Sequence, residues 1–421
     1  MFYQEIKNSL NTLDSKFITF NDLESFYIDL LNKSSLTVKQ IGLTNLDNWK
    51  FNNDGSFGHS SGKFFSINSV DYKNEISMIL LQPEIGLLCN FMTIVDKTAY
   101  FLIQFKEEPG NINKIQMSPT IQATKSNYSK VHGGNLPNYW EEYIKNEQDS
   151  SMLSFDLPEQ GTRYWQKFNN NKIVLTPMFD EKNNYKWLTL GQILRFKKIS
   201  NSVNSCLRSS LSLVYDFYLN DDDKKNTNSV KSHLNKLKKH NNKSFLSKDV
   251  RKFYQEDSDS LKFDNQNDRF EIVGVEVFSK SREILKWTQP LVAELSGQQY
   301  FLLSFQKNKE KYFIWSIDRE AGFKSGFNLG PSLKNISYEN SFQDKISLFE
   351  EMNIKEKFIM SEEGGRFLNF EVEHILSEIN EEQFDTKNYD YLVLNEYETN
   401  ELNKLGYLSM EARSLFFFSL D

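Results

Sequence analysis

Short motifs in this chain occur twice, in the same order, about 200 residues apart. The segment 158–164 (PEQGTRY), for example, is repeated at 361–367 (SEEGGRF). A single pair could arise by chance, but an ordered set indicates an internal duplication into two large units, and not a solenoid of small repeats. The other matched pairs are 81–83 with 288–290, 100–103 with 312–315, 117–120 with 329–332, 185–190 with 389–394, and 207–209 with 412–414.

The sequences of the two units predict the same order of secondary structure. Runs rich in Val, Ile, Phe and Tyr, separated by turn residues, predict three strands in each unit. A segment with apolar residues at spacings of three and four predicts a helix at the end of each unit. This order indicates an α+β fold with mixed β-sheets and flanking helices. The predicted strands are 62–70, 76–81 and 98–105, then 270–278, 283–287 and 311–318; the predicted helices are 189–199 and 392–405.

The chain has 421 residues, which is too long for one ordinary core. We expect an N-terminal helical arm at 1–45, a first unit at 46–219, a linker at 220–267 and a second unit at 268–421. The basic stretch 230–240 within the linker is typical of a solvated helix. A nucleic-acid-binding role is the less common alternative for such a short charge run.

The charge balance and the cysteines indicate the class of protein. The net charge of -7 argues against a role on nucleic acid or at a membrane surface, because both need a basic face. No apolar run approaches the roughly 20 residues of a membrane span, and we expect no signal peptide at the N-terminus. Cys89 and Cys206 lie far apart among apolar or small residues, which predicts buried, reduced thiols. We therefore expect a cytoplasmic protein.

Several common chemistries have no motif in this sequence. It contains neither a Gly-x-Gly-x-x-Gly dinucleotide fingerprint nor a P-loop. Its five histidines never pair at metal-ligand spacing, and it has no Cys-x-x-Cys. A Gly-x-Ser-x-Gly nucleophile elbow is also missing. We expect no metal and no other cofactor.

The stretch 118–128 (SPTIQATKSNY), followed by His132, Gly133 and Gly134, is neither a periodic helix nor an alternating strand. Its hydroxyls and amides suit a hydroxyl-rich ligand, Lys125 suits a phosphate, and the glycines allow close backbone approach. The second unit has no counterpart of 124–128, which predicts one working site and one altered or vestigial site. His132 is either a general base or a loop histidine, and Tyr128 either meets the substrate or packs against the loop.

Carboxylates and an arginine surround a turn glycine in each unit, at 159–163 and 362–366. The functional interpretation is a carboxylate for acid–base chemistry with an arginine for phosphate. The structural alternative is a turn with a salt bridge. Trp287 either stacks on a nucleobase or is a core aromatic at a strand end.

The sequence resembles the nucleotide-diphosphate-hexose 2,3-dehydratases of deoxysugar biosynthesis over nearly its whole length. The string 118–128 with 131–134 is the most specific part. The resemblance implies two tandem Nudix-like domains from a duplication, a homodimer, and one active pocket beside one leftover pocket in each subunit. The glutamate box of Nudix hydrolases is missing, which fits a fold reused without metal-dependent hydrolysis. The other matching segments are 48–49, 61–65, 81–86, 108–111, 187–192, 287–290, 361–367 and 412–415.

The implied substrate is thymidine diphosphate (dTDP) linked to a 4-keto-6-deoxyglucose. The implied activity is a hydro-lyase that takes the C3 proton, expels the C2 hydroxyl and leaves a 3,4-diketo-2,6-dideoxyhexose nucleotide for a ketoreductase or an aminotransferase. The acid–base candidates are Tyr128, His132, Glu84 and Glu159, and which one takes the C3 proton is left open. The predicted substrate-binding residues, with Lys125 and Arg163 on phosphate, are Thr120, Gln122, Thr124, Lys125, Ser126, Asn127, Gly133, Gly161, Arg163, Trp287, Glu362, Glu363, Gly364 and Arg366.

Two other classes of function remain open. One is a Nudix-like hydrolase that cuts the nucleotide sugar with a divalent metal. The other is a protein that binds a nucleotide sugar without chemistry. Loss of water from the sugar separates the dehydratase from both.

Overall fold

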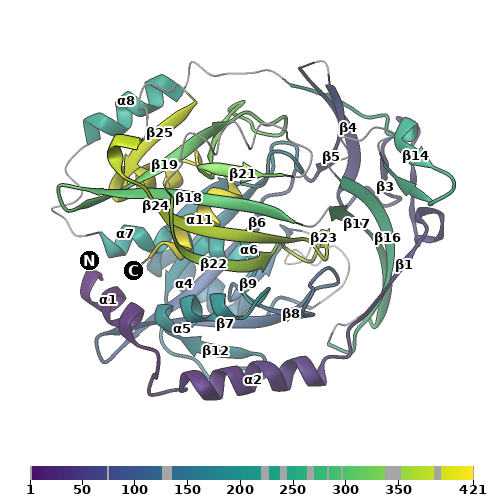
Figure 1. The fold of residues 1–421 in the computed structure, drawn as a ribbon. Helices are drawn as coiled ribbons and strands as arrows, with labels where there is room; N and C mark the ends of the chain where they lie inside the picture. The colour runs from purple at the N-terminus through teal and green to yellow at the C-terminus, as the bar shows by residue number, and fades with distance from the viewer. Residues whose placement is uncertain are drawn as a thin grey trace.

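The residues that the structure describes form four β-sheets with helices packed between and around them (Figure 1). The computed structural model describes residues 2–73, 75–125, 135–219, 227–237, 244–262, 270–281, 284–294, 297–336, 352–383 and 390–420. Two seven-stranded sheets occupy the left and centre of Figure 1, and two smaller sheets lie on the right.

The first seven-stranded sheet belongs to the first half of the chain. Its strands pair antiparallel except for β11 and β6, which run parallel, so the sheet is mixed. Apolar and aromatic residues fill β6 and β7, which are buried over most of their length. The strand order is β10 (Ser151–Pro158), β11 (Phe168–Leu175), β6 (Gly86–Val95), β7 (Thr98–Glu107) and β12 (Tyr185–Leu188), with β8 (Ile115–Ser118) on β7 and β9 (Ile121–Ala123) on β6.

The second seven-stranded sheet has the same pairing pattern, built from the second half. Its one parallel pair, β18 with β24, occupies the place of β6 with β11. The order is β22 (Asn353–Ser361), β24 (Glu371–Glu378), β18 (Gln298–Lys307), β19 (Glu310–Asp318) and β25 (Tyr391–Asn395), with β20 (Asn328–Gly330) on β19 and β21 (Leu333–Asn335) on β18.

Matching helices follow each sheet. Capping boxes start α5 (Leu190–Arg195) at Thr189 and α10 (Glu396–Lys404) at Asn395. The predicted helix 189–199 is α5 continued by a 3-10 turn, η2 (Phe196–Lys198). The predicted helix 392–405 is wrong at its start, because Tyr391–Asn395 pairs with β19 as a strand. The fully buried helices α6 (Ser205–Leu211) and α11 (Met410–Phe418) contact each other, and they contact β6 and β18 respectively.

The two smaller sheets contain the strands predicted at the start of each unit. Strand β16 spans 270–278 as predicted. The predicted strand 283–287 is largely wrong, because β17 begins only at Lys286 and runs to Glu294. The predicted strand 62–70 corresponds to β4, which begins later, at Ser66. One sheet has the order β13 (Phe245–Ser247), β4 (Ser66–Tyr72), β3 (Phe57–His59) and β2 (Trp49–Phe51), with β5 (Glu75–Leu81) on β4. The other has β14 (Tyr254–Gln255), β15 (Ser260–Leu261), β16 (Phe270–Phe278), β17 (Lys286–Glu294) and β23 (Phe367–Leu368), with β1 (Thr37–Ile41) on β16.

The N-terminal segment and the segment between the halves both join the body. Helix α2 (Phe20–Lys33) runs along the lower edge in Figure 1 and buries Leu23 and Tyr27. The Tyr27 hydroxyl donates to the carbonyl oxygen of Ile115 at 2.9 Å. The segment between the halves supplies a helix and strands β13, β14 and β15. The remaining helices are α1 (Tyr3–Asn11), α4 (Trp140–Ser150), α7 (Tyr215–Tyr218) and α8 (Thr227–Leu237).

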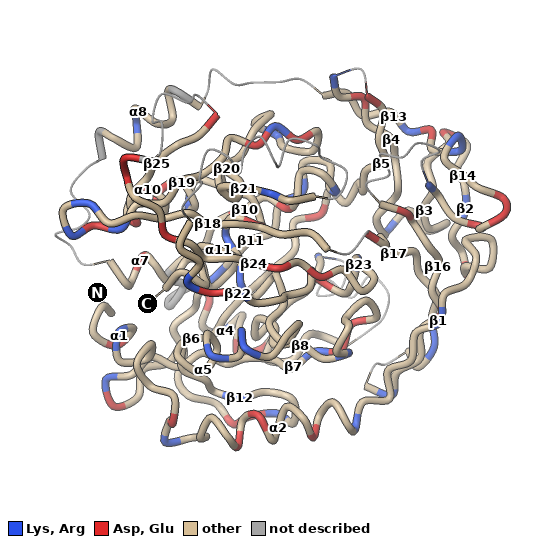
Figure 2. Tube along the Cα trace, in the orientation of Figure 1, with Lys and Arg blue, Asp and Glu red and all other residues tan. Residues whose placement is uncertain are grey.

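Basic and acidic residues are interspersed along α2 and the outer loops (Figure 2). Among the residues that the structure describes, no helix is long and apolar enough to span a membrane.

Candidate active site

A polar cluster lies where the two halves of the chain meet. Gln122, on β9, donates from Nε2 to Oε1 of Glu108 at 3.1 Å and to Oε1 of Glu363 at 3.4 Å. Glu108 follows β7 of the first half, and Glu363 follows β22 of the second half. The Lys106 ammonium lies 2.7 Å from Oε1 of Glu108. We define the first cluster as Gln122, Glu108, Glu363, Lys106 and Arg366. In this cluster, the amide of Gln122 joins two carboxylates that come from opposite halves of the chain.

The turn after β22 reaches the first half through close backbone contact. The N–H of Gly110 donates to the carbonyl oxygen of Gly364 at 2.7 Å. A Cβ on Gly110 would lie 1.6 Å from the carbonyl oxygen of Phe367, so only glycine fits there. This contact sets the position of Glu363 relative to β9.

Arg366 brings a cation to the cluster from the same turn. Its guanidinium lies 4.3 Å from the ring centre of Phe65, a favourable cation–π contact. Its Nη1 donates to the carbonyl oxygen of Gly365 at 2.8 Å, and its Nη2 lies 3.5 Å from Oε1 of Gln82. Its buried Nε has no hydrogen-bond partner among the described residues. Arg366 therefore keeps hydrogen-bonding capacity for an anionic ligand.

Glu159 is buried close to the first cluster. Its carboxylate accepts a hydrogen bond from Nδ2 of Asn169, whose Oδ1 accepts from the N–H of Gly86 at 3.1 Å. Lys167 donates to the carbonyl oxygen of Glu84. These contacts connect the end of β10, the start of β11 and the loop before β6, which is the strand that pairs with β9.

Burial shifts the pKa of several groups here. Burial, followed by the neighbouring charge of Glu108, raises the pKa of Glu363 to about 8, while Arg366 and Lys106 oppose the shift. Burial also raises the pKa of Glu159, against the nearby Arg413 and Lys167. This raised pKa favours the neutral, protonated form of Glu363. Such a group can donate a proton.

The equivalent place in the second half is closed by ion pairs. The Lys334 ammonium lies 2.5 Å from Asp318 and 3.0 Å from Glu320. Arg163, the counterpart of Arg366, is 4% exposed and pairs with Glu294. We call these five residues the second cluster. Both of its cations are already paired with carboxylates of the same cluster.

The predicted ligand residues around β9 differ in their surroundings. Thr120 is a buried structural residue: its Oγ1 accepts from the N–H of Phe91 at 3.0 Å and donates to the carbonyl oxygen of Leu102. Thr124 and the exposed Lys125 follow β9 directly. The predictions that lie outside the described residues are Ser126, Asn127, Tyr128, His132 and Gly133.

The remaining predicted residues belong to the turns and β17. Glu362 is buried beside Arg208 and accepts from Nε2 of Gln160 at 2.8 Å. Burial raises its pKa to about 7. Gly161 packs against the ring of Phe323. The half-buried Trp287 donates to Gln289 at 2.9 Å, and Gln289 donates to the carbonyl oxygen of Gly365 at 3.0 Å.

The predicted site residues omitted Glu108, Lys106, Gln82 and Lys167. The segment 108–111 was already part of the family resemblance. A carboxylate two residues before a glycine also occurs at Glu320 in the second half, and this repetition is the signal that could have identified Glu108.

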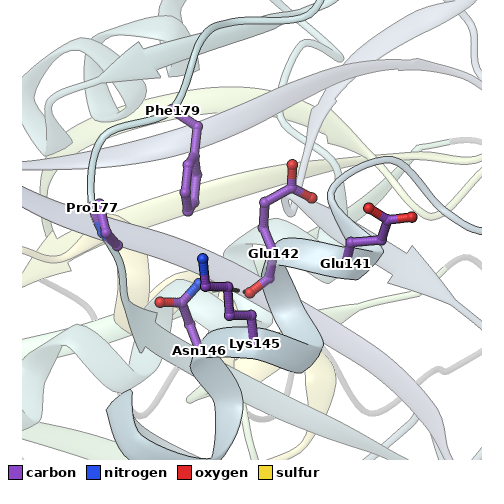
Figure 3. A pocket seen from close by; sticks show the side chains of 6 residues that line it. All are labelled: Glu141, Glu142, Lys145, Asn146, Pro177 and Phe179. Atoms are coloured by element: carbon purple, nitrogen blue, oxygen red, sulfur yellow. Dashed lines mark hydrogen bonds between the residues drawn. The ribbon is translucent and has the colours of Figure 1, made fainter.

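A surface pocket of about 280 Å³ lies between α4 and the loop after β11 (Figure 3). Phe179 points towards α4, which presents two carboxylates and one lysine. The lining residues are Glu141, Glu142, Lys145, Asn146, Pro177 and Phe179, and none of the predicted site residues is among them. In the described ranges, no three His, Cys, Asp or Glu side chains are placed together to hold a metal ion.

Comparison with known proteins gives one family. The model of the family described as NDP-hexose 2,3-dehydratase matches residues 21–214 and 228–418. Three relatives carry the name dTDP-4-dehydro-6-deoxy-alpha-D-glucopyranose 2,3-dehydratase. The protein from Amycolatopsis orientalis is 27% identical, covering 98% of this chain and 93% of its own. The Saccharopolyspora spinosa protein is 24% identical (94% and 90%), and the Streptomyces violaceoruber protein is 26% identical (86% and 88%).

Among solved structures, an ADP compounds hydrolase is 8% identical over 32% of this chain, with a TM-score of 0.21. That likeness is too slight to support an argument about the fold. The family match, by contrast, covers most of both halves. The chain belongs to the NDP-hexose 2,3-dehydratase family.

Proposed function

We propose that this protein removes water across C2 and C3 of a dTDP-linked 4-keto-6-deoxyglucose. The observation that carries the proposal is the nearly full-length similarity to relatives whose name states this reaction. The product is a 3,4-diketo-2,6-dideoxyhexose nucleotide, on which a ketoreductase or an aminotransferase would act next.

The chemistry requires four contributions from the protein. The C4 ketone acidifies the C3 hydrogen, and a base removes it to give an enolate. A donor stabilises the enolate oxygen, an acid protonates the departing C2 hydroxyl, and cations hold the diphosphate. The overall change is an elimination without oxidation or reduction.

We assign the diphosphate to Lys125 and Arg366, with Thr124, Ser126 and Asn127 orienting the ligand. Lys125 lies three residues after Gln122, which keeps it within about 10 Å of chain from the first cluster. The predicted phosphate role of Arg163 competes with its buried ion pair to Glu294.

The base is one of Glu84, Glu159, Tyr128 and His132, as the sequence predicts. Glu159 borders the first cluster, and its buried carboxylate has a raised pKa, which makes a stronger base. Glu84 is half-buried beside Lys167, which donates to its carbonyl oxygen.

We also propose that the two halves are Nudix-like domains from a duplication, and that the protein is a cytoplasmic homodimer. The common pairing pattern of the seven-stranded sheets supports the duplication. So do equivalent hydrogen bonds: Ser332 joins the N–H of Leu303 to the carbonyl oxygen of Ile314, as Thr120 joins Phe91 to Leu102. The two segments matched by the family model correspond to the two halves.

Mass spectrometry of the sugar nucleotide after incubation with the protein tests the function. The labile product is trapped by a reductase added in the same reaction. We expect a nucleotide sugar that has lost one water and then gained two hydrogens. Release of thymidine monophosphate would indicate a hydrolase, and tight binding of an unchanged substrate would indicate a binding protein.

A further inference from the structure

Glu108 and Glu363 approach the same amide from opposite halves of the chain. The Nε2 of Gln122 lies 3.1 Å from one carboxylate and 3.4 Å from the other. Glu108 is 3% exposed, and its Oε2 has no hydrogen-bond partner in the part of the chain that the structure describes. The Oε1 of Glu363 also accepts from the N–H of Gly365 at 3.0 Å. Two acids thus converge on one amide, and Glu108 keeps an acceptor oxygen that the described part of the protein does not use.

The equivalent region around the second cluster shows that the fold does not need an acid at the position of Glu363. Glu320 and Lys334 occupy the places of Glu108 and Gln122, and Gln160 occupies the place of Glu363. The amide of Gln160 donates to Glu362 at 2.8 Å, and the surrounding turn has the same backbone contact, from the N–H of Gly322 to Gly161 at 2.8 Å. An amide therefore satisfies the turn, and the acid at 363 has another use.

The charges around Glu363 favour one proton on the pair. Two carboxylates that share a site do not both ionise readily, because their charges repel at short range. Glu108 already pairs with the Lys106 ammonium. Glu363 also faces Arg366, from its own turn, and Glu159, from the end of β10. The proton therefore belongs on Glu363.

We propose, given the dehydratase function above, that Glu363 of the second half is the acid that protonates the departing C2 hydroxyl in the first-half site. The second half is then part of the active site and not a spare copy of it.

The step balances as follows. A separate base takes the C3 proton, and the electron pair is delocalised onto the C4 oxygen as an enolate. That electron pair then forms the C2–C3 double bond while the C2–O bond breaks. The Glu363 proton passes to the leaving oxygen, which departs as water. Glu363 is left as a carboxylate beside Arg366 and Gln122, and solvent returns its proton. The enol then becomes the C3 ketone.

Three variants test this proposal: Glu363→Gln, Glu363→Asp, and the control Glu320→Gln, which changes a largely buried acid of the second cluster at the place equivalent to Glu108. Each is compared with the unaltered protein for melting temperature, for dehydration, and for exchange of the C3 hydrogen in deuterium oxide. A substrate carrying fluorine at C2 adds a fourth measurement, since fluoride leaves with little help from an acid.

We expect Glu363→Gln to lose dehydration by about a hundredfold or more, the usual size of a general-acid effect. It should still exchange the C3 hydrogen and release fluoride. Glu363→Asp should recover part of the activity, and Glu320→Gln should dehydrate within about twofold of the unaltered protein, in contrast to the general-acid loss.

Full dehydration by a folded Glu363→Gln overturns the proposal, as does loss of C3 exchange in that variant. An equal loss in Glu320→Gln also overturns it, because the effect would then not be specific to position 363. If the unaltered protein does not dehydrate the substrate, the proposed function itself is wrong.

Discussion

Arg208 and Arg413 bond reciprocally across the two halves of the molecule. The Nε of Arg208 donates to the hydroxyl of Ser414 at 3.1 Å, and the Nε of Arg413 donates to the hydroxyl of Ser209 at 2.8 Å. Each arginine thus contacts the serine that follows the other one in sequence, and both side chains are fully buried.

Each arginine also holds the turn of the opposite half. Arg208 donates to the carbonyl oxygen of Ser361 at 3.1 Å, and Arg413 donates to that of Pro158 at 2.5 Å. Ser361 is two residues before Glu363, so Arg208 helps to place the acid assigned above. Helices α6 and α11 are therefore both the junction of the halves and the support of the site.

Replacing Arg208 with Met should destabilise the protein strongly. Glu362, which lies 3.6 Å from Nη2 of Arg208, would lose its charge partner while buried. Breaking a buried pair in this way costs about 3–5 kcal/mol. Denaturant unfolding of Arg208→Met and of the surface variant Lys355→Ala measures the loss. A change below about 1 kcal/mol, the usual ceiling for a surface ion pair, would contradict this view of the junction.

Gly110→Ala should reduce turnover by displacing the Glu363 turn. A Cβ at this position would lie 1.6 Å from a backbone oxygen of that turn. A displacement of about 1 Å at a reacting group can lower the rate on the order of a hundredfold. The control is Gly62→Ala, which has a φ of +64° but no atom within 4 Å of the new Cβ. Equal kcat/KM values for the two variants would show that the contact between the halves does not position the site.

His374→Phe should make the protein less sensitive to acid. His374 is buried against the ring of Phe358, and burial lowers its pKa to about 3. The unfolded chain takes up a proton at about pH 6.5 and the folded chain does not, so stability is lost as pH falls from 6.5 towards 3.

By pH 4.5 this loss amounts to about 2–3 kcal/mol. Denaturant unfolding at pH 7 and pH 4.5 should therefore show a smaller difference for His374→Phe than for the unaltered protein. The buried glutamates contribute equally to both proteins, so their effect cancels. An unchanged difference would mean that His374 is protonated in the folded state.

Lys125→Ala should weaken substrate binding more than turnover. A charge-assisted hydrogen bond to phosphate is worth about 1.5–3 kcal/mol, which corresponds to a KM raised roughly tenfold to a hundredfold. Steady-state kinetics of Lys125→Ala gives KM and kcat separately. An unchanged KM would remove Lys125 from the diphosphate site.

The sequence predicted part of the fold for clear physical reasons. Strands 270–278 and 311–318 are confirmed, as β16 and as most of β19, because turn residues border their β-branched and aromatic runs. Strand β6 was not predicted, since its run of apolar residues is buried on both faces and lacks an alternating pattern. The helical pattern of α10 extends the predicted helix back to residue 392, although residues 392–394 pair with β19.

The site was harder to predict than the elements. Gln122 and Glu363 both stood among the predicted ligand residues, but nothing in the sequence indicated that they meet. They are 241 positions apart, and the contact depends on how two sheets and two arginine-bearing helices pack. Local sequence patterns indicate secondary structure. The partner of a buried carboxylate, by contrast, is determined by the tertiary structure.

The most direct test of the whole account uses dTDP-4-keto-6-deoxyglucose labelled with deuterium at C3, in the presence of a metal chelator. We expect the sugar nucleotide to lose one water and the deuterium to pass into the solvent. Thymidine monophosphate appearing while the sugar keeps its deuterium would contradict the account.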